Sequence, residues 1–131
     1  MTESATIEST FVVINPALQA EGVAVTNTLF SELEQQYDNF KGHMLISSFS
    51  FDEDWPTWEM HPHGDEFVCL LSGDVELLLR GPAGEQKVRL RSPGSFVIVP
   101  KNTWHKAKVN SPAKMIFVTP GQGTENRESP P

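Results

Sequence analysis

Short segments in which apolar and polar residues alternate, separated by turns that contain proline or glycine, run through most of this sequence. A period of two is the pattern of a strand with one buried face. The 10 Pro and 9 Gly among 131 residues supply the turns. Many short strands spaced in this way are typical of a small β-sandwich or barrel, so an all-β fold is expected. The predicted strands are 10–16, 43–51, 58–61, 66–72, 74–80, 86–90, 96–99, 105–110 and 114–119.

One segment near the N-terminus breaks this pattern and predicts one short helix. Its apolar residues recur at helical spacing within residues 28–38. Residues 1–9 are polar and are expected to form a flexible arm, and the polar residues 121–131 are expected to form a flexible tail. Residues 10–120 contain no internal repeat and are expected to form a single domain. The residues at helical spacing are Leu29, Phe30, Leu33 and Tyr37.

Charge and composition exclude several classes of partner. The formal net charge of −7 argues against nucleic acid and against anionic membranes, since both require a basic surface. No apolar run approaches the length of a membrane span, and the polar N-terminus lacks the apolar region of a secretory signal. Cys69 is the single cysteine, which excludes an intramolecular disulfide and fits a reducing compartment. We therefore expect a cytoplasmic protein that binds neither nucleic acid nor membrane.

The residues best suited to chemistry gather in two regions. Residues 58–66 contain two histidines and three carboxylates within nine positions. These side chains are of the types that bind divalent transition metals. The second region contains His105, which shares one face of a predicted strand with Ala107 and Val109 and is therefore expected to be buried.

The spacing in the first region resembles the first sequence motif of the cupin superfamily. That motif ends in a glutamate, six further residues and a glycine, and Glu66 and Gly73 stand at this spacing. The 20 residues between Gly73 and Gly94 suit the hairpin that separates the two motifs in the family.

The second region resembles the second cupin motif, which runs glycine, five residues, proline, one residue, glycine, two residues and histidine. Gly94, Pro100 and His105 match it, and Asn102 replaces the second glycine. Asparagine tolerates the left-handed backbone that such a turn requires. The resemblance covers residues 43–119 and implies a cupin-type double-stranded β-helix, or jelly-roll, barrel with the short helix ahead of it.

The resemblance also implies a set of metal ligands, and two registers are open. Counting back from Glu66 over four intervening residues reaches His61, with Glu59 two positions earlier on the same strand face. The alternative pairs His61 with His63, which lies between a proline and a glycine where the chain turns. We favour the first register, in which Glu59, His61, Glu66 and His105 are the ligands. His63 then lies at the rim and is the alternative ligand.

Two imidazoles and two carboxylates suit Fe(II), Mn(II), Ni(II) or Zn(II), and the sequence does not choose among them. The resemblance to small cupins implies a metal-dependent enzyme acting on a small polar organic substrate, dioxygenase- or isomerase-like. The alternative is a non-enzymatic small-molecule or metal-binding sensor module. Fold does not decide between these classes, so no catalytic residue is assigned. An acidic site favours cationic or neutral ligands.

Aromatic residues near both regions are candidates for a substrate pocket. Trp55, Trp58 and Trp104 flank the proposed site in sequence and are large enough to form an aromatic wall. We expect Trp58 and Trp104 to line the pocket, and a core or dimer contact is the alternative for at least one of the three tryptophans. His43 shares a strand face with apolar residues and is expected at the pocket or packed in the core.

The strand face opposite to Glu66 predicts a contact between subunits. Phe67, Cys69 and Leu71 alternate with inward-facing residues and form an outward apolar set. Such a surface favours association, and small cupins commonly form homodimers. We therefore expect a homodimer, with Cys69 pointing away from the cavity.

Overall fold

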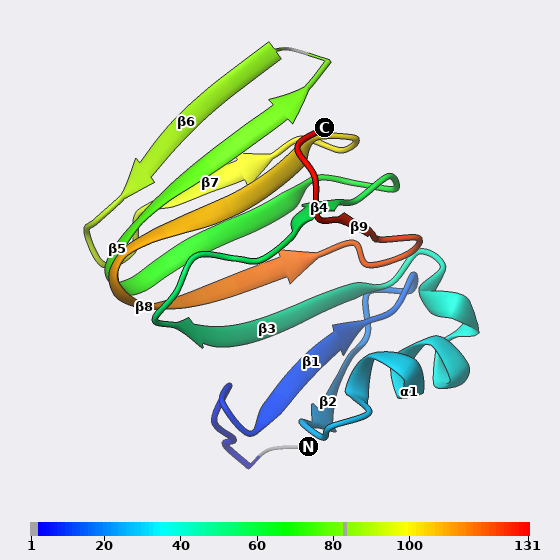
Figure 1. Ribbon diagram of the computed structural model, residues 1–131. Coiled ribbons are helices and arrows are strands. Elements are labelled where there is room, and N and C mark those ends of the chain that lie inside the picture. Colours follow the sequence, from blue (N-terminus) through cyan, green and yellow to red (C-terminus); the bar gives the residue numbers. More distant parts are fainter. Residues whose placement is uncertain (1–2, 83) are drawn as a thin grey trace.

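Antiparallel strands make up most of the computed structural model, which describes residues 3–82 and 84–131 (Figure 1). The predicted helix is present as α1 (Leu29–Gln36) and is followed by the 3-10 turn η1 (Asp38–Phe40). Residues 1–2 of the expected N-terminal arm lie outside the described residues. The strands are β1 (Thr10–Ile14), β2 (Ala20–Ala24), β3 (Met44–Phe51), β4 (Trp58–Met60), β5 (Glu66–Gly81), β6 (Gly84–Leu90), β7 (Phe96–Val99), β8 (Trp104–Thr119) and β9 (Glu125–Arg127).

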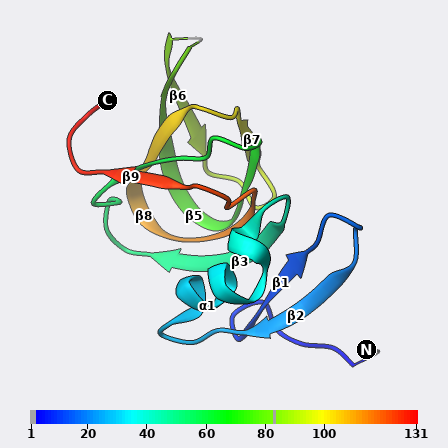
Figure 2. The same cartoon turned by 90° about the vertical axis from the view of Figure 1, so that its right-hand side faces the viewer.

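The strands pair in the order β2-β1-β3-β8-β4-β9, and β5 joins this path by pairing with β6, β7 and β8. The longest ladder is that between β5 and β8, which runs from Phe67 opposite Val118 to Arg80 opposite Trp104. Viewed along the barrel, β5, β7 and β8 curve around a common centre (Figure 2). The all-β jelly-roll barrel with one helix is therefore confirmed.

Strand β5 is longer than the sequence predicted. Residues 66–72 and 74–80 were expected as separate strands, but β5 continues through Gly73 with register shifts between Leu70 and Val75. Gly73 has φ of 97°, and a Cβ at this position would stand 2.6 Å from the Cα of Ala113. The glycine therefore lets β5 bend closely past β8 without ending.

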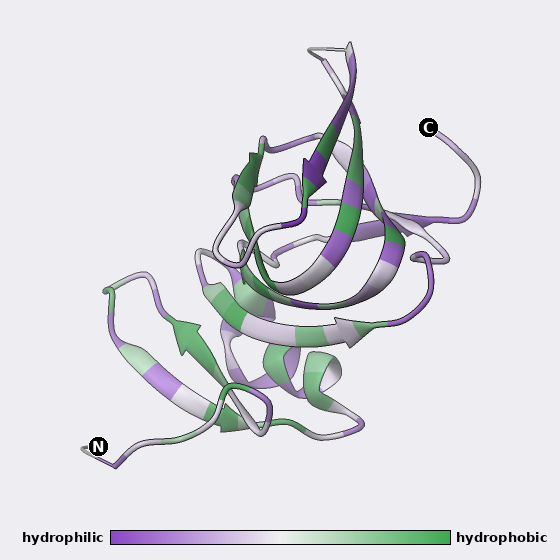
Figure 3. Ribbon diagram, turned by 90° about the vertical axis from the view of Figure 1, so that its left-hand side faces the viewer, coloured by the Kyte–Doolittle hydropathy of each residue, from purple (hydrophilic) through white to green (hydrophobic). Residues whose placement is uncertain are grey.

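Alternation along the strands builds the barrel interior. Hydrophobic and hydrophilic bands follow one another along the long curved strands (Figure 3). In β5 the predicted inward residues Glu66, Val68 and Leu70 are buried, and Cys69 lies half-buried on the opposite face. The barrel core consists of Trp55, Val68, Leu70, Val75, Leu77, Leu79, Leu90, Val99, Ala107, Ala113, Met115 and Phe117.

A second apolar cluster joins the N-terminal elements to the barrel. In the views of Figures 1 and 2, α1 lies beside β1 and β3, outside the ring of strands. Strand β2 pairs with β1, although its largely exposed sequence AEGVA gave no strand signal. The cluster consists of Phe11, Val13, Leu29, Leu33, Phe40 and Leu45. None of the helical segments within the described residues has the length and apolar character needed to cross a bilayer.

The C-terminal residues contribute a strand that the sequence did not predict. Residues 121–131 were expected to lack regular structure, whereas β9 pairs with β4, with Glu59 opposite Asn126. Ahead of β9, the N–H and hydroxyl of Thr124 both donate to the carbonyl oxygen of Gly121 and close a turn. Because β4 also pairs with β8, this segment lies beside the strands that carry the predicted ligands.

Candidate metal centre

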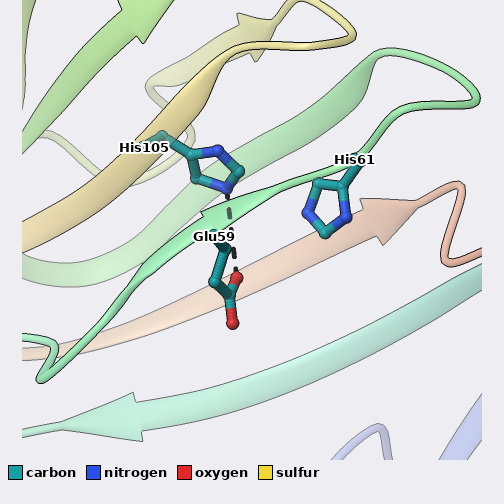
Figure 4. A group of neighbouring side chains, drawn as sticks. All are labelled: Glu59, His61 and His105. Carbon is teal, nitrogen blue, oxygen red and sulfur yellow. Dashed lines mark ion pairs between the residues drawn. The ribbon is translucent and has the colours of Figure 1, made fainter. Parts of the chain in front are cut away.

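Three strands bring the predicted ligands together. Glu59 in β4 pairs with His105 in β8, and His61 follows directly after β4. One donor atom from each of Glu59, His61 and His105 lies within 4.8 Å of the others, and the three side chains point toward one another (Figure 4). Glu66, the first residue of β5, contacts both rings: its Oε1 lies 3.0 Å from Nε2 of His105, and its Oε2 lies 3.3 Å from Nε2 of His61.

Hydrogen bonds between the two motif turns hold this arrangement. Asn102 has φ of 62°, the left-handed conformation expected where it replaces a glycine. Its backbone N–H donates to the carbonyl oxygen of His61 at 3.0 Å. The neighbouring N–H of Lys101 donates to Oδ1 of Asp65 at 2.8 Å. The turn after β7 is thereby joined to the turn after β4.

The hydrogen-bond partners of the imidazoles fix which ring nitrogen carries hydrogen. Nδ1 of His61 lies 2.8 Å from Oγ1 of Thr124, whose own hydrogen is donated to Gly121. The threonine oxygen must therefore accept a hydrogen from Nδ1. Nδ1 of His105 lies 3.1 Å from the carbonyl oxygen of Thr103, which can only accept. In the neutral form, both rings then present the lone pair of Nε2 to the site.

The atoms that face one another in the site lack hydrogen-bond partners. His61, Glu66 and His105 are 5%, 3% and 0% exposed. Within the described residues, Nε2 of both histidines and Oε1 of Glu66 are buried without a hydrogen-bond partner. Two lone pairs opposite a carboxylate are stable only when a proton or a cation lies among them. These donors therefore fit a divalent transition-metal ion.

The charges of the site act on each other strongly. Burial raises the pKa of Glu66, but its contacts with the imidazoles of His105 and His61, when these rings are protonated, outweigh burial and lower that pKa to about 2. Burial lowers the pKa of His105, but the carboxylate of Glu66, whose Oε1 lies 3.0 Å from Nε2, raises it overall. For Glu59, burial and the neighbouring charge of Glu66 raise the pKa. The site thus favours positive charge between its carboxylates.

A cavity of about 740 Å³ opens beside these residues. Its wall includes Glu59, His61 and Glu66 together with side chains from β3, α1, the 52–57 loop and the 121–126 segment. His105 lies behind this wall. The cavity gives a small molecule access to three of the four predicted ligands.

The tryptophans predicted to line the pocket lie elsewhere. Trp58 faces away from Glu59, and its ring packs against the guanidinium of Arg80 and the ammonium of Lys106 at 5.2 and 5.7 Å from the ring centroid. Trp104 packs against the guanidinium of Arg127 at 5.5 Å. Neither belongs to the cavity wall. Strand alternation explains this, because both are one position from an inward-facing ligand.

His43 also lies outside the cavity wall. Its Nδ1 lies 2.8 Å from the carbonyl oxygen of Lys41, and its ring packs against Tyr37 and Phe40. His63 is exposed in the turn between β4 and β5, as expected for a rim residue. Trp55 is the tryptophan that lines the cavity, and its ring centroid is 6.2 Å from that of His105.

Two threonines that sequence reasoning missed contact the predicted ligands. The hydroxyl of Thr119 donates to Oε2 of Glu66 at 2.6 Å. Its inward position follows from the alternation with buried Phe117, so this signal was available in the sequence. Thr124 contacts His61 only because the C-terminal segment folds back toward β4, and no local pattern indicated that.

Comparisons with known proteins agree with this architecture. A cupin-2 domain containing protein from Shewanella frigidimarina NCIMB 400 is 19% identical, with a TM-score of 0.50 over 59% of this chain and 70% of that chain. Hydroquinone 1,2-dioxygenase from Sphingomonas sp. TTNP3, solved with 4-hydroxybenzoate bound, is 21% identical, with a TM-score of 0.51. This alignment covers 58% of each chain. These structures share the fold.

No curated protein sequence matches the chain. The family model described as "Cupin domain" matches residues 52–119, more than half of the sequence. This range contains both histidine motifs and the strands β4 to β8. The chain therefore belongs to the cupin domain family.

Proposed function

We propose that this cupin holds one divalent transition-metal ion with Glu59, His61, Glu66 and His105. The observation that carries the proposal is the set of buried, unpartnered atoms that face one another, Nε2 of both histidines and Oε1 of Glu66. An ion there accepts both lone pairs and balances the carboxylates. Imidazole and carboxylate donors suit Fe, Mn, Ni or Zn.

The site supports a metal-dependent enzyme that acts on a small organic molecule, dioxygenase- or isomerase-like. When bound, the ion would supply Lewis-acid chemistry at coordination positions left open to substrate. Glu59 is the least buried of the four residues, with a side chain 36% exposed, so a molecule in the cavity meets it first. Buried aromatic side chains in the cavity wall, Trp55 and Phe117 among them, exclude water from this end.

A non-enzymatic binding or sensor module is the second candidate function. Apart from the four proposed ligands, the cavity wall contains no buried titratable side chain within the described residues. Such a wall can bind an effector without reacting with it. Turnover of a substrate by the metal-loaded protein separates the two functions.

We also propose a cytoplasmic homodimer as the working form. Cys69 is the single cysteine of the sequence, which fits a reducing compartment. Phe96 and Ile98 in β7 are 56% and 55% exposed and extend the outward apolar face that Phe67 and Cys69 begin in β5.

Metal content of the purified protein, measured by mass spectrometry, tests the site. We expect about one equivalent in the native chain, strong loss in His61→Ala and in His105→Ala, and full retention in the matched control His63→Ala. Metal retained in both of the first two variants would contradict the proposal. Loss in His63→Ala together with retention in Glu59→Gln would instead favour the register that uses His63.

A further inference from the structure

The charged side chains of the cavity wall are of one sign. Among the described residues that line it, none is lysine or arginine, and His61 is the only one with a basic group. A ligand that enters therefore meets carboxylates first. The acidic residues in the wall are Glu34, Asp52, Glu53, Asp54, Glu59 and Glu66.

Four aromatic rings form one continuous cluster in the cavity wall. The ring of Phe51 lies 5.4 Å from that of Trp55 and 6.2 Å from that of Phe117, measured between centroids. Trp55 and Phe117 are 5.9 Å apart, and Phe49 lies 6.1 Å from Phe117. All four residues line the cavity, so a flat apolar ligand finds aromatic partners along its length.

Three of the acidic residues, Asp52, Glu53 and Asp54, are exposed and form an acidic rim at the mouth of the cavity. They belong to the 52–57 loop, which is hydrogen-bonded to β8. The N–H of Trp55 donates to the carbonyl oxygen of Ala107 at 3.0 Å, and Oδ1 of Asp54 accepts the N–H of Val109 at 2.7 Å. Asp52 and Glu53 are exposed and make no side-chain hydrogen bond or ion pair with other described residues. The loop thus carries the carboxylates of Asp52 and Glu53 at the mouth, and neither has an ion-pair partner among the described residues.

The inner end of the cavity offers polar atoms that also lack partners. His61 and Glu66 line the cavity, and Nε2 of the first and Oε1 of the second are buried and without hydrogen-bond partners. The cavity wall therefore combines exposed carboxylates, aromatic rings and buried polar atoms without partners.

We propose that this cavity selects cationic aromatic molecules, an aryl ring joined by a short chain to a protonated amine. The ring lies against the aromatic wall, and the ammonium lies at the acidic rim, where cation–π and carboxylate contacts both favour it. Aromatic carboxylates are repelled by the same rim. This inference names the ligand class of the cavity that the proposed function uses, but the preference originates in the wall and does not require bound metal.

Three probes of similar size test the preference: 2-phenylethylammonium, 2-phenylethanol and 3-phenylpropanoate. Calorimetric titration is done on the full chain, once freed of metal by chelation and once loaded with metal. We expect the cation to bind about tenfold more tightly than the alcohol and the anion to bind most weakly, with differences that shrink as salt is raised. A fourth probe, 2-cyclohexylethylammonium, is expected to bind several-fold more weakly than its aromatic counterpart.

Variants separate the rim from the net charge of the protein. Asp52→Asn combined with Glu53→Gln is expected to weaken binding of 2-phenylethylammonium roughly fivefold and to leave 2-phenylethanol unchanged. The control combines Glu3→Gln with Glu128→Gln, which removes the same charge at exposed positions outside the cavity wall and should change neither affinity.

An anion that binds as tightly as the cation, or no binding of any probe to either form of the protein, overturns the inference. Equal affinity for the aromatic and cyclohexyl amines overturns its aromatic part. Metal content is measured on the same samples, so a chain that holds metal without charge preference refutes this inference and leaves the proposed function standing. A chain that holds no metal but keeps the charge preference refutes the proposed metal site and leaves this inference standing.

Discussion

Thr124 determines which nitrogen of His61 faces the proposed metal. Its hydroxyl donates to Gly121 and accepts from Nδ1, which keeps Nε2 free of hydrogen. Thr124→Val preserves the shape of the side chain but removes the acceptor, so the affinity for Zn²⁺ is expected to fall roughly 10- to 100-fold. Competition with a chromogenic chelator measures this. Thr124→Ser, the matched control, keeps the hydroxyl and should bind as the native chain does; equal affinity in the valine variant would show that Thr124 has no orienting role.

The sequence was sufficient to predict that the four proposed ligands lie together, because motif spacing and strand alternation fix which side chains share a face. Glu59 lies in β4 and His61 directly after it, two positions on, and their predicted inward direction agrees with the structure. The residues of the cavity wall were harder to predict from the sequence. Trp58 and Trp104 had the right size and proximity in sequence, but the same alternation that turns the ligands inward turns these two rings outward.

At the scale of the strand, Gly73 allows β5 to run unbroken past β8. Gly73→Ala is expected to lower the free energy of unfolding by about 2 kcal/mol or more, since positive φ and close contact with Ala113 both oppose a Cβ. Gly84 has φ of 101° but no atom within 4 Å of an added Cβ, so Gly84→Ala isolates the backbone strain. Urea denaturation compares the two. Equal losses would mean that the close approach to β8 contributes nothing.

The strands that the sequence did not predict lack the alternation of apolar and polar residues on which such predictions depend. β2 (AEGVA) and β9 (ENR) are short, mostly exposed and poor in residues that favour strands, and each exists because a neighbouring strand offers an edge. β8 was divided in two because Pro112 interrupts its alternation, although the ladder with β5 continues on both sides. Pairing between distant segments, which a local window does not contain, decided these cases.

For the whole molecule, the outward face of β5 and β7 bears on oligomeric state. The ring of Phe67 lies 5.1 Å from that of Phe96, and Phe67 pairs with Ile98 across the two strands. We expect sedimentation velocity at micromolar concentration to show a dimer, and Ile98→Lys to shift it to monomer without unfolding. Leu18→Lys, which changes an 84% exposed leucine between β1 and β2, is the control and should remain dimeric. A native chain that sediments as a monomer would contradict the proposed interface.

The contact between Thr124 and His61 also has a consequence for biosynthesis. A chain leaves the ribosome from its N-terminal side, so Glu59, His61, Glu66 and His105 emerge before Thr124 and β9 do. Until residues 121–127 have emerged, His61 lacks the acceptor that holds its tautomer, and β4 lacks one of its two neighbouring strands. On the proposed function, the nascent barrel therefore acquires its full affinity for metal only after residues 121–127 have emerged.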